Sequence, residues 1–147
     1  VAIGDCQQSG LLAVSDGNMS RAKYLLAMVE KQYRKEKDLS VEAAISWDAK
    51  SVSVDHIVPR SKNVVVGADG KNSLVKERQH SLPNLALLER SVNNSIGNLE
   101  YPEKGPKLAD SEFLLTNELS ALDEFGDKEI ENREHLILDL AMKAWPL

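Results

Sequence analysis

The stretch SVSVDHIVPR, residues 51–60, decides the fold, because it joins a strand pattern to an acid and an imidazole. Its valines alternate with serines, which is the period-two pattern of a half-buried β-strand. Asp55 and His56 follow directly, and Pro59, which cannot donate to a sheet ladder, indicates that the strand ends nearby. Neighbouring side chains on a regular strand point to opposite faces, so both can face one site only if the strand twists or ends there.

Two asparagine positions lie where the next strand and the following helix are expected. NLALLE, residues 84–89, is the next strand candidate and begins with Asn84. RSVNNSIGN, residues 90–98, predicts a short helix that Gly97 ends, and it carries Asn93 and Asn94. This is the layout of a ββα metal finger. The predicted fold class is therefore α+β, with a ββα-metal finger core surrounded by helices.

Apolar residues at helical spacing predict three longer helices, at 20–37, about 110–125 and 127–145. A further strand is predicted at 44–47, a long polar loop at 59–83, and turns at 100–107. In the last helix, we expect His135 on the solvent side and Arg133 in an ion pair with the finger. Trp47 and Trp145 are expected to anchor the core, since both lie in apolar periodic contexts.

The 147 residues correspond to one ordinary domain. We predict a domain at 20–147, preceded at 1–19 by a linker or by a segment of a missing upstream domain. No window has the about eighteen apolar residues that a membrane span needs, so we expect no membrane contact. Cys6 is the only cysteine, which excludes an internal disulfide and favours a reducing, cytoplasmic setting. Because residue 1 is Val, we expect a piece of a longer protein.

The charge of the chain is unevenly distributed. Its 18 basic and 23 acidic residues give a net charge of −5, which argues at first against binding to nucleic acid. Between Lys50 and Arg90, however, seven Lys and Arg stand against four Asp and Glu, so this segment carries 7 − 4 = +3 and the rest carries −8. The basic segment coincides with the Asp-His motif, which favours a partner with phosphate groups.

These motifs resemble those of the HNH, or His-Me finger, nuclease superfamily. DHIVP at 55–59 is similar to its first strand, LPNLALL at 82–88 to its second, and RSVNN at 90–94 to the start of its helix. More narrowly, about residues 20–147 resemble the C-terminal nuclease domain of GmrSD-type modification-dependent restriction and phage-defence proteins. The closing helix of that family is similar to IENREHLILDLAMKAWP at 130–146. Asp55 stands where that family often has Glu, a difference that keeps a carboxylate.

The resemblance implies a role for each motif residue: His56 is the general base, Asp55 and Asn93 are metal ligands, and Asn84 braces the strand-loop junction that orients His56. Phosphodiester hydrolysis needs a base for the attacking water and a counter-charge for the phosphoryl group and leaving oxygen. Mg²⁺, Mn²⁺ or another divalent cation supplies that counter-charge and binds oxygen ligands. Asn94 is a rival of Asn93, because successive helix residues are turned about 100° apart and only one is expected to face the metal.

Four basic residues are candidate phosphate contacts: Arg60, Lys62, Arg90 and Lys104. The predicted function is that of a divalent-metal-dependent DNA endonuclease or nickase acting on duplex DNA. The resemblance implies a larger restriction or anti-phage defence protein with an upstream nucleotide-hydrolysing sensor domain. Two alternatives stay open. One is a degenerate finger that binds DNA or protein without cutting, and the other is a metal-dependent RNase, because a ββα finger contacts phosphates and reads few bases.

Overall fold

The computed structural model describes residues 19–39, 51–58, 64–66, 72–74, 81–97, 99 and 101–145. The elements in these ranges are α2 (Met19–Glu36), β1 (Val52–His56), β2 (Val64–Val66), β3 (Asn72–Leu74), η2 (Leu82–Asn84), β4 (Leu85–Glu89), α3 (Arg90–Ile96), α4 (Tyr101–Lys107), η3 (Leu108–Asp110), α5 (Leu114–Asn117), η4 (Glu118–Ala121) and α6 (Asp127–Ala144). Helices and short antiparallel sheets confirm the predicted α+β class. The strand predicted at 44–47 and Trp47 lie outside the described residues.

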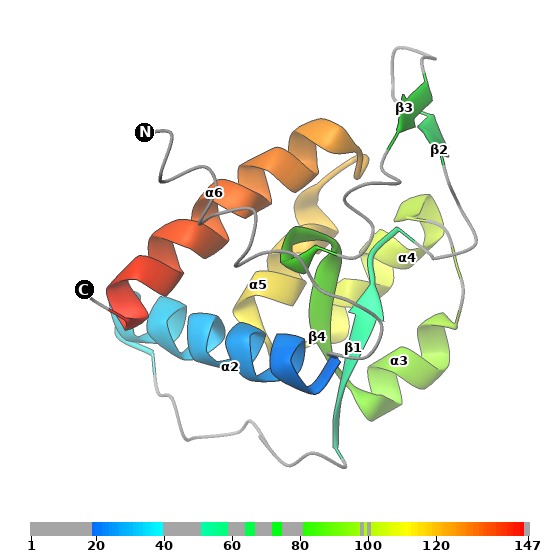
Figure 1. Ribbon diagram of the computed structural model, residues 1–147. Coiled ribbons are helices and arrows are strands. Elements are labelled where there is room, and N and C mark those ends of the chain that lie inside the picture. The colour runs from blue at the N-terminus through cyan, green and yellow to red at the C-terminus, as the bar shows by residue number, and fades with distance from the viewer. Residues whose placement is uncertain are drawn as a thin grey trace.

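A two-stranded antiparallel sheet of β1 and β4 lies at the centre of the molecule, with helices to either side (Figure 1). Its register pairs Val52 with Glu89 at one end and His56 with Leu85 at the other. Strand β4 is buried from Leu85 to Leu88, so both of its faces are covered. This explains why its sequence is a continuous apolar run, whereas β1 alternates.

Two apolar clusters cover the two faces of this sheet. The first joins one face to α2 and α6 and includes Leu26, Val52, Leu85, Leu87 and Ile137. The second joins the opposite face to α3, α4 and the segment before α6, and includes Ile57, Ala86, Leu88, Ile96, Tyr101 and Phe125. Odd and even positions of β4 thus enter different clusters, as the period of a strand requires.

Helices α2 and α6 pack on each other and confirm the predicted helices at the two ends of the domain. In α6, the apolar stripe is buried at Ile130, Ile137 and Leu140, and His135 is exposed as expected. The prediction for Trp145 is wrong. It follows the last residue of α6 and is 36% exposed, with its ring 6.4 Å from that of Tyr24.

The prediction of one continuous helix at about 110–125 is also wrong, because the chain forms the short helices η3, α5 and η4 there. The Glu30 carboxylate of α2 accepts hydrogen bonds from the backbone N–H groups of Leu114 and Leu115, over 2.9 and 3.0 Å. These two donors lie at the start of α5, where N–H groups have no partner within the helix. Glu30 therefore caps the start of α5 from a distant element.

Two further segments are more ordered than predicted. Residues 101–107, predicted as turns, form α4, with Pro102 in the first turn, where proline is tolerated. The predicted loop at 59–83 contains the antiparallel hairpin of β2 and β3, in which Val64 pairs with Leu74. None of the helices in the described ranges has the length and apolar composition needed to cross a membrane.

Candidate active site

Helix α3 follows β4 directly and contacts both β1 and β4, which completes a ββα unit. The helix ends at Ile96 and is followed by Gly97, whose φ of +58° suits a residue without a side chain. The Nδ2 group of Asn93 donates a hydrogen bond of 3.0 Å to the Ser53 hydroxyl on β1. Asn94 is exposed, whereas Asn93 is half-buried. Asn93 is therefore the asparagine of the pair that faces the sheet.

Asp55 shares a face of β1 with Ser53, because side chains two residues apart on a strand lie on one side. Its carboxylate accepts a hydrogen bond of 2.9 Å from the ammonium of Lys104, which also donates to the His56 carbonyl over 2.8 Å. Burial raises the pKa of the Asp55 carboxyl, and the Lys104 ammonium opposes that rise. The Lys104 side chain is 1% exposed and that of Asp55 18%, so solvent reaches the carboxylate more than the ammonium.

His56 is half-buried and ends β1 opposite Leu85. By strand alternation, its side chain leaves the sheet on the face opposite to Asp55. The alternation stops immediately afterwards, because the consecutive residues Ile57 and Val58 are both buried in the second cluster. The strand therefore ends at His56. Such an end is one of the two conditions under which the side chains of Asp55 and His56, which are adjacent in sequence, can approach one site.

Asn84 is fully buried and clamps the chain that leaves β1. Its Oδ1 accepts a hydrogen bond from the Val58 N–H over 2.9 Å, and its Nδ2 donates to the Val58 carbonyl over 3.2 Å. The Asn84 carbonyl also accepts from the Ile57 N–H over 2.8 Å. Three hydrogen bonds from one residue therefore hold the two residues that follow His56.

Arg133 of α6 holds both neighbours of Asn84. Its guanidinium donates to the carbonyls of Pro83, Leu85 and Leu115, over 3.0, 2.8 and 3.2 Å. The link between the last helix and the finger was expected to be an ion pair, but it consists of hydrogen bonds to backbone carbonyls. Burial lowers the pKa of Arg133 to about 10, so the guanidinium remains charged at neutral pH.

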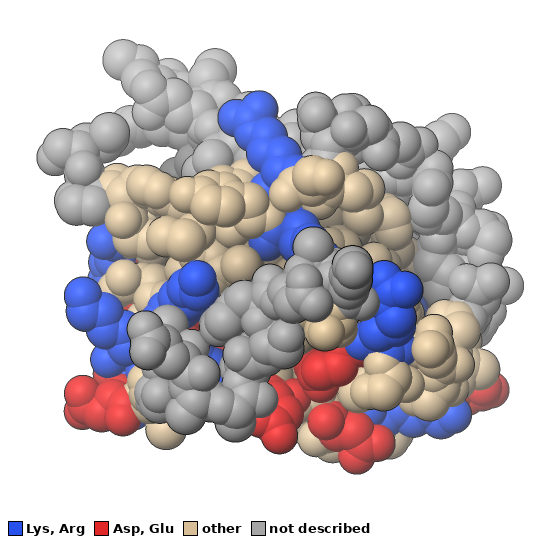
Figure 2. All heavy atoms as spheres, turned by 90° about the horizontal axis from the view of Figure 1, so that it is seen from below, with Lys and Arg blue, Asp and Glu red and all other residues tan. Residues whose placement is uncertain are grey.

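The four predicted phosphate contacts lie in different environments. Arg90 is exposed at the first position of α3, whereas Lys104 is buried against Asp55. Arg60 and Lys62 lie outside the described residues, as do all the other basic residues between 50 and 90 except Arg90. On the face shown in Figure 2, the described Lys and Arg side chains lie in separate groups, with Asp and Glu near several of them. The phosphate roles remain predictions.

The donor set of the α3 face fits a hard divalent cation. Asp55 offers a carboxylate, and the Asn93 amide, whose nitrogen is bonded to Ser53, offers its oxygen. Within the described part of the chain, no three His, Cys, Asp or Glu side chains gather as a complete metal cage. Mg²⁺ does not need one, because it often binds through one or two protein oxygens and completes its shell with waters and substrate phosphates.

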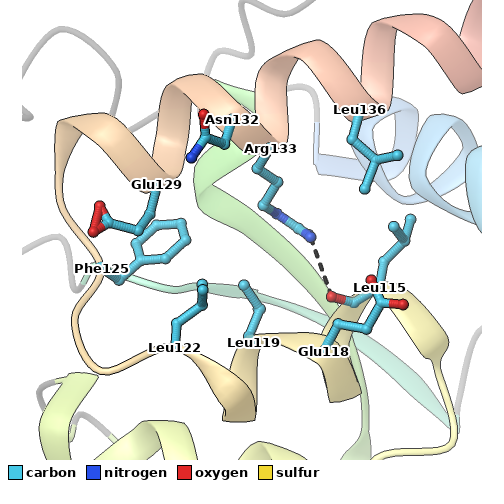
Figure 3. A pocket seen from close by; sticks show the side chains of 9 residues that line it. All are labelled: Leu115, Glu118, Leu119, Leu122, Phe125, Glu129, Asn132, Arg133 and Leu136. Carbon is cyan, nitrogen blue, oxygen red and sulfur yellow. Dashed lines mark hydrogen bonds between the residues drawn. The ribbon is translucent and has the colours of Figure 1, made fainter.

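A cavity of about 210 Å³ lies elsewhere, between α6 and the η4 segment (Figure 3). Its lining includes leucines and Phe125, and the guanidinium of Arg133 reaches the Leu115 carbonyl at its side. No predicted site residue lines it, and its volume is below the about 300 Å³ at which ligand pockets begin. The candidate active site is therefore the ββα unit and not this cavity.

Comparison with known families agrees with this assignment. The family model for the C-terminal domain of GmrSD restriction endonucleases matches residues 8–140, which include β1, β4 and α3. The chain belongs to this family. No curated protein matches it. Membership supports a nuclease role for this GmrSD C-terminal domain, and the family description implies a larger protein of which it is one part. The match begins within residues 1–19, the segment predicted as a linker.

Two contacts of the GmrSD C-terminal domain were not predicted from sequence. The alternation of β1 indicates only that Ser53 is on its polar side, although a position two residues before Asp55 places both side chains on the same face. The bond from Lys104 to Asp55 joins residues 49 positions apart, and no local pattern indicates it. The structure brings Asp55, Asn93 and Lys104 to one face of the sheet, with His56 at the strand end.

Proposed function

We propose that this domain is a divalent-metal-dependent DNA endonuclease that hydrolyses phosphodiester bonds one strand at a time. It would act as the nuclease part of a larger cytoplasmic restriction or anti-phage defence protein, with target choice made by an upstream nucleotide-hydrolysing sensor domain. One observation carries the proposal: the Asn93 amide is bonded to Ser53, so that it shares the face of β1 with the Asp55 carboxylate. Family membership supports the nuclease class.

The proposed roles follow from where each residue lies. His56, at the strand end, would take the proton of the attacking water. Asn84 would hold His56 in place through its three bonds to Ile57 and Val58. Asp55 and Asn93 would hold Mg²⁺ or Mn²⁺, which supplies counter-charge for the phosphoryl group and the leaving oxygen. Exposed Arg90 would contact a backbone phosphate, as would Arg60 and Lys62, whereas the buried Lys104 ammonium would hold Asp55 and not reach a phosphate.

Incubation of the full chain with supercoiled plasmid tests the proposal. We expect relaxed circles to accumulate with Mg²⁺ or Mn²⁺ and not with a chelator. Intact plasmid at every metal concentration would contradict an endonuclease.

The same assay separates the two rival functions. A metal-dependent RNase would cut a structured RNA in the parallel reaction and leave the plasmid intact. A degenerate binder would slow the migration of the plasmid in a gel without cutting either substrate. The partly exposed carboxylate of Asp55 favours the nuclease over the binder, because a surface that only binds phosphate gains nothing from a carboxylate.

A further inference from the structure

The Ser53 hydroxyl has two hydrogen-bond partners in the structure. It donates to the Leu88 carbonyl across the sheet over 3.3 Å, and it lies 3.0 Å from the Asn93 amide nitrogen. Leu88 is the residue that pairs with Ser53 in the β1–β4 register. The hydroxyl is therefore attached to the rigid centre of the sheet on one side and to α3 on the other.

The direction of these two bonds determines the orientation of the Asn93 side chain. A carbonyl oxygen can only accept, so the single hydrogen of the Ser53 hydroxyl is directed at Leu88. The serine oxygen is then left as an acceptor, which the Asn93 NH₂ group satisfies. The oxygen of that planar amide must point away from Ser53.

From this geometry, we propose that Ser53 is a positioning residue that holds the Asn93 amide with its oxygen free to bind a divalent cation beside Asp55. The inference rests on the proposed function, because it concerns the same metal site. Ser53 itself touches neither metal nor substrate. It acts through Asn93, whose amide could otherwise rotate to present its nitrogen, which cannot bind a cation.

The alternative is that Ser53 only satisfies polar groups of the sheet. In that case its loss would lower stability and leave the metal affinity of the folded protein unchanged. Loss of a residue that orients a metal ligand typically lowers metal affinity by about 10- to 100-fold. The two roles considered for Ser53 therefore predict measurably different metal affinities.

Mn²⁺ binding to the full chain, measured by calorimetry without DNA, distinguishes them. We expect Ser53→Ala to raise the Mn²⁺ dissociation constant about tenfold or more. Ser53→Thr, which keeps the hydroxyl on a strand-forming residue, should restore most of the affinity. The control Ser120→Ala removes a hydroxyl that donates to the Asn117 carbonyl over 2.7 Å outside the ββα unit, and it should bind Mn²⁺ as the wild type does.

The double variant separates positioning from a structural effect. Once Asn93 is Ala, Ser53→Ala should lower the Mn²⁺ affinity no further. An unchanged Mn²⁺ affinity in Ser53→Ala, while Asn93→Ala weakens binding, would overturn the role of Ser53 and leave the proposed function intact. Failure of the wild-type chain to bind Mn²⁺ at all would overturn the metal site and this inference together.

Discussion

The buried ammonium of Lys104 on α4 lies 2.9 Å from the Asp55 carboxylate on β1. The bond ties the second apolar cluster to the candidate metal ligand, because α4 packs in that cluster through Tyr101. A second bond from the same ammonium holds the His56 carbonyl over 2.8 Å. One lysine thus holds the side chain of Asp55 and the backbone of His56, the two residues expected to carry the chemistry.

Replacing Lys104 by Met should destabilise the domain. The variant keeps most of the apolar stem but leaves the partly buried Asp55 without its counter-charge and the His56 carbonyl without this donor. We expect the free energy of unfolding to fall by about 2–3 kcal/mol. Urea denaturation at neutral pH measures the change. Lys107→Met, on the exposed side of the same helix, should cost far less, and equal losses for the two variants would contradict the importance of the Lys104–Asp55 pair.

Asn84 should be needed for both stability and cleavage. Asn84→Ala removes both side-chain bonds to the Val58 backbone inside the core, which should lower the free energy of unfolding by about 3 kcal/mol. Asn117→Ala is a matched control, because the Asn117 side chain also makes two hydrogen bonds to the backbone, from its Nδ2 to the carbonyls of Ala109 and Ser111. Nicking rates at a temperature where both variants are folded should fall for Asn84→Ala alone. Equal nicking rates would show that Asn84 only stabilises the fold.

The central strands and helix of the site could be predicted from sequence because their signals are local. Alternating valines identify β1, an apolar run identifies β4, and Gly97 ends α3 through its own backbone conformation. The short helix also restricted the choice between Asn93 and Asn94, since helix geometry turns only one of them to the sheet.

The structural features that could not be predicted depend on contacts between residues distant in the sequence. The start of α5 is determined by Glu30, a residue of α2 that bonds its first N–H groups. Arg133 could be assigned to a link between helix and finger, but three carbonyls rather than a carboxylate are its partners. Gly105 and Pro106 predicted a turn, yet α4 forms because Tyr101 and Lys104 bury their side chains. Packing outweighs local propensity in such cases.

Tyr101 should make the domain sensitive to alkaline pH. Its hydroxyl donates to the carbonyls of Leu119 and Leu122, and burial raises its pKa to about 12, with Glu129 and Asp123 adding to the rise. The phenol of an unfolded chain has a pKa of about 10. The folded state therefore favours the protonated phenol, and this stabilising contribution is complete below pH 10 and lost as the pH rises toward 12.

Tyr101→Phe tests this dependence. At pH 8, the variant should be less stable by about 1 kcal/mol, because two carbonyls lose a donor. Between pH 10 and 12, its stability should fall less steeply than that of the wild type. Burial also raises the pKa of Tyr33, which is present in both proteins. Both proteins should therefore still lose some stability between pH 10 and 12. Parallel stability curves for the two proteins would disprove the role of Tyr101.

His56→Ala should reduce plasmid nicking by about a hundredfold or more, the usual contribution of a general base. The fold should survive, since His56 is only half-buried and belongs to neither apolar cluster. His135→Ala, at an exposed position of α6, is the matched control and should nick at the wild-type rate. A folded His56→Ala protein with near-normal activity would remove His56 from the mechanism.

The dependence of plasmid nicking on Mn²⁺ concentration in the wild type, Asn93→Ala and Asn94→Ala tests the metal site most directly. Asn93 is half-buried and bonded to Ser53 on the face that carries Asp55, whereas its neighbour Asn94 is exposed. Asn93→Ala should therefore nick slowly and require a higher Mn²⁺ concentration for half-maximal rate, and Asn94→Ala should follow the wild-type curve. The opposite ranking, or nicking by the wild type that a chelator does not abolish, would contradict a metal site formed by Asp55 and Asn93.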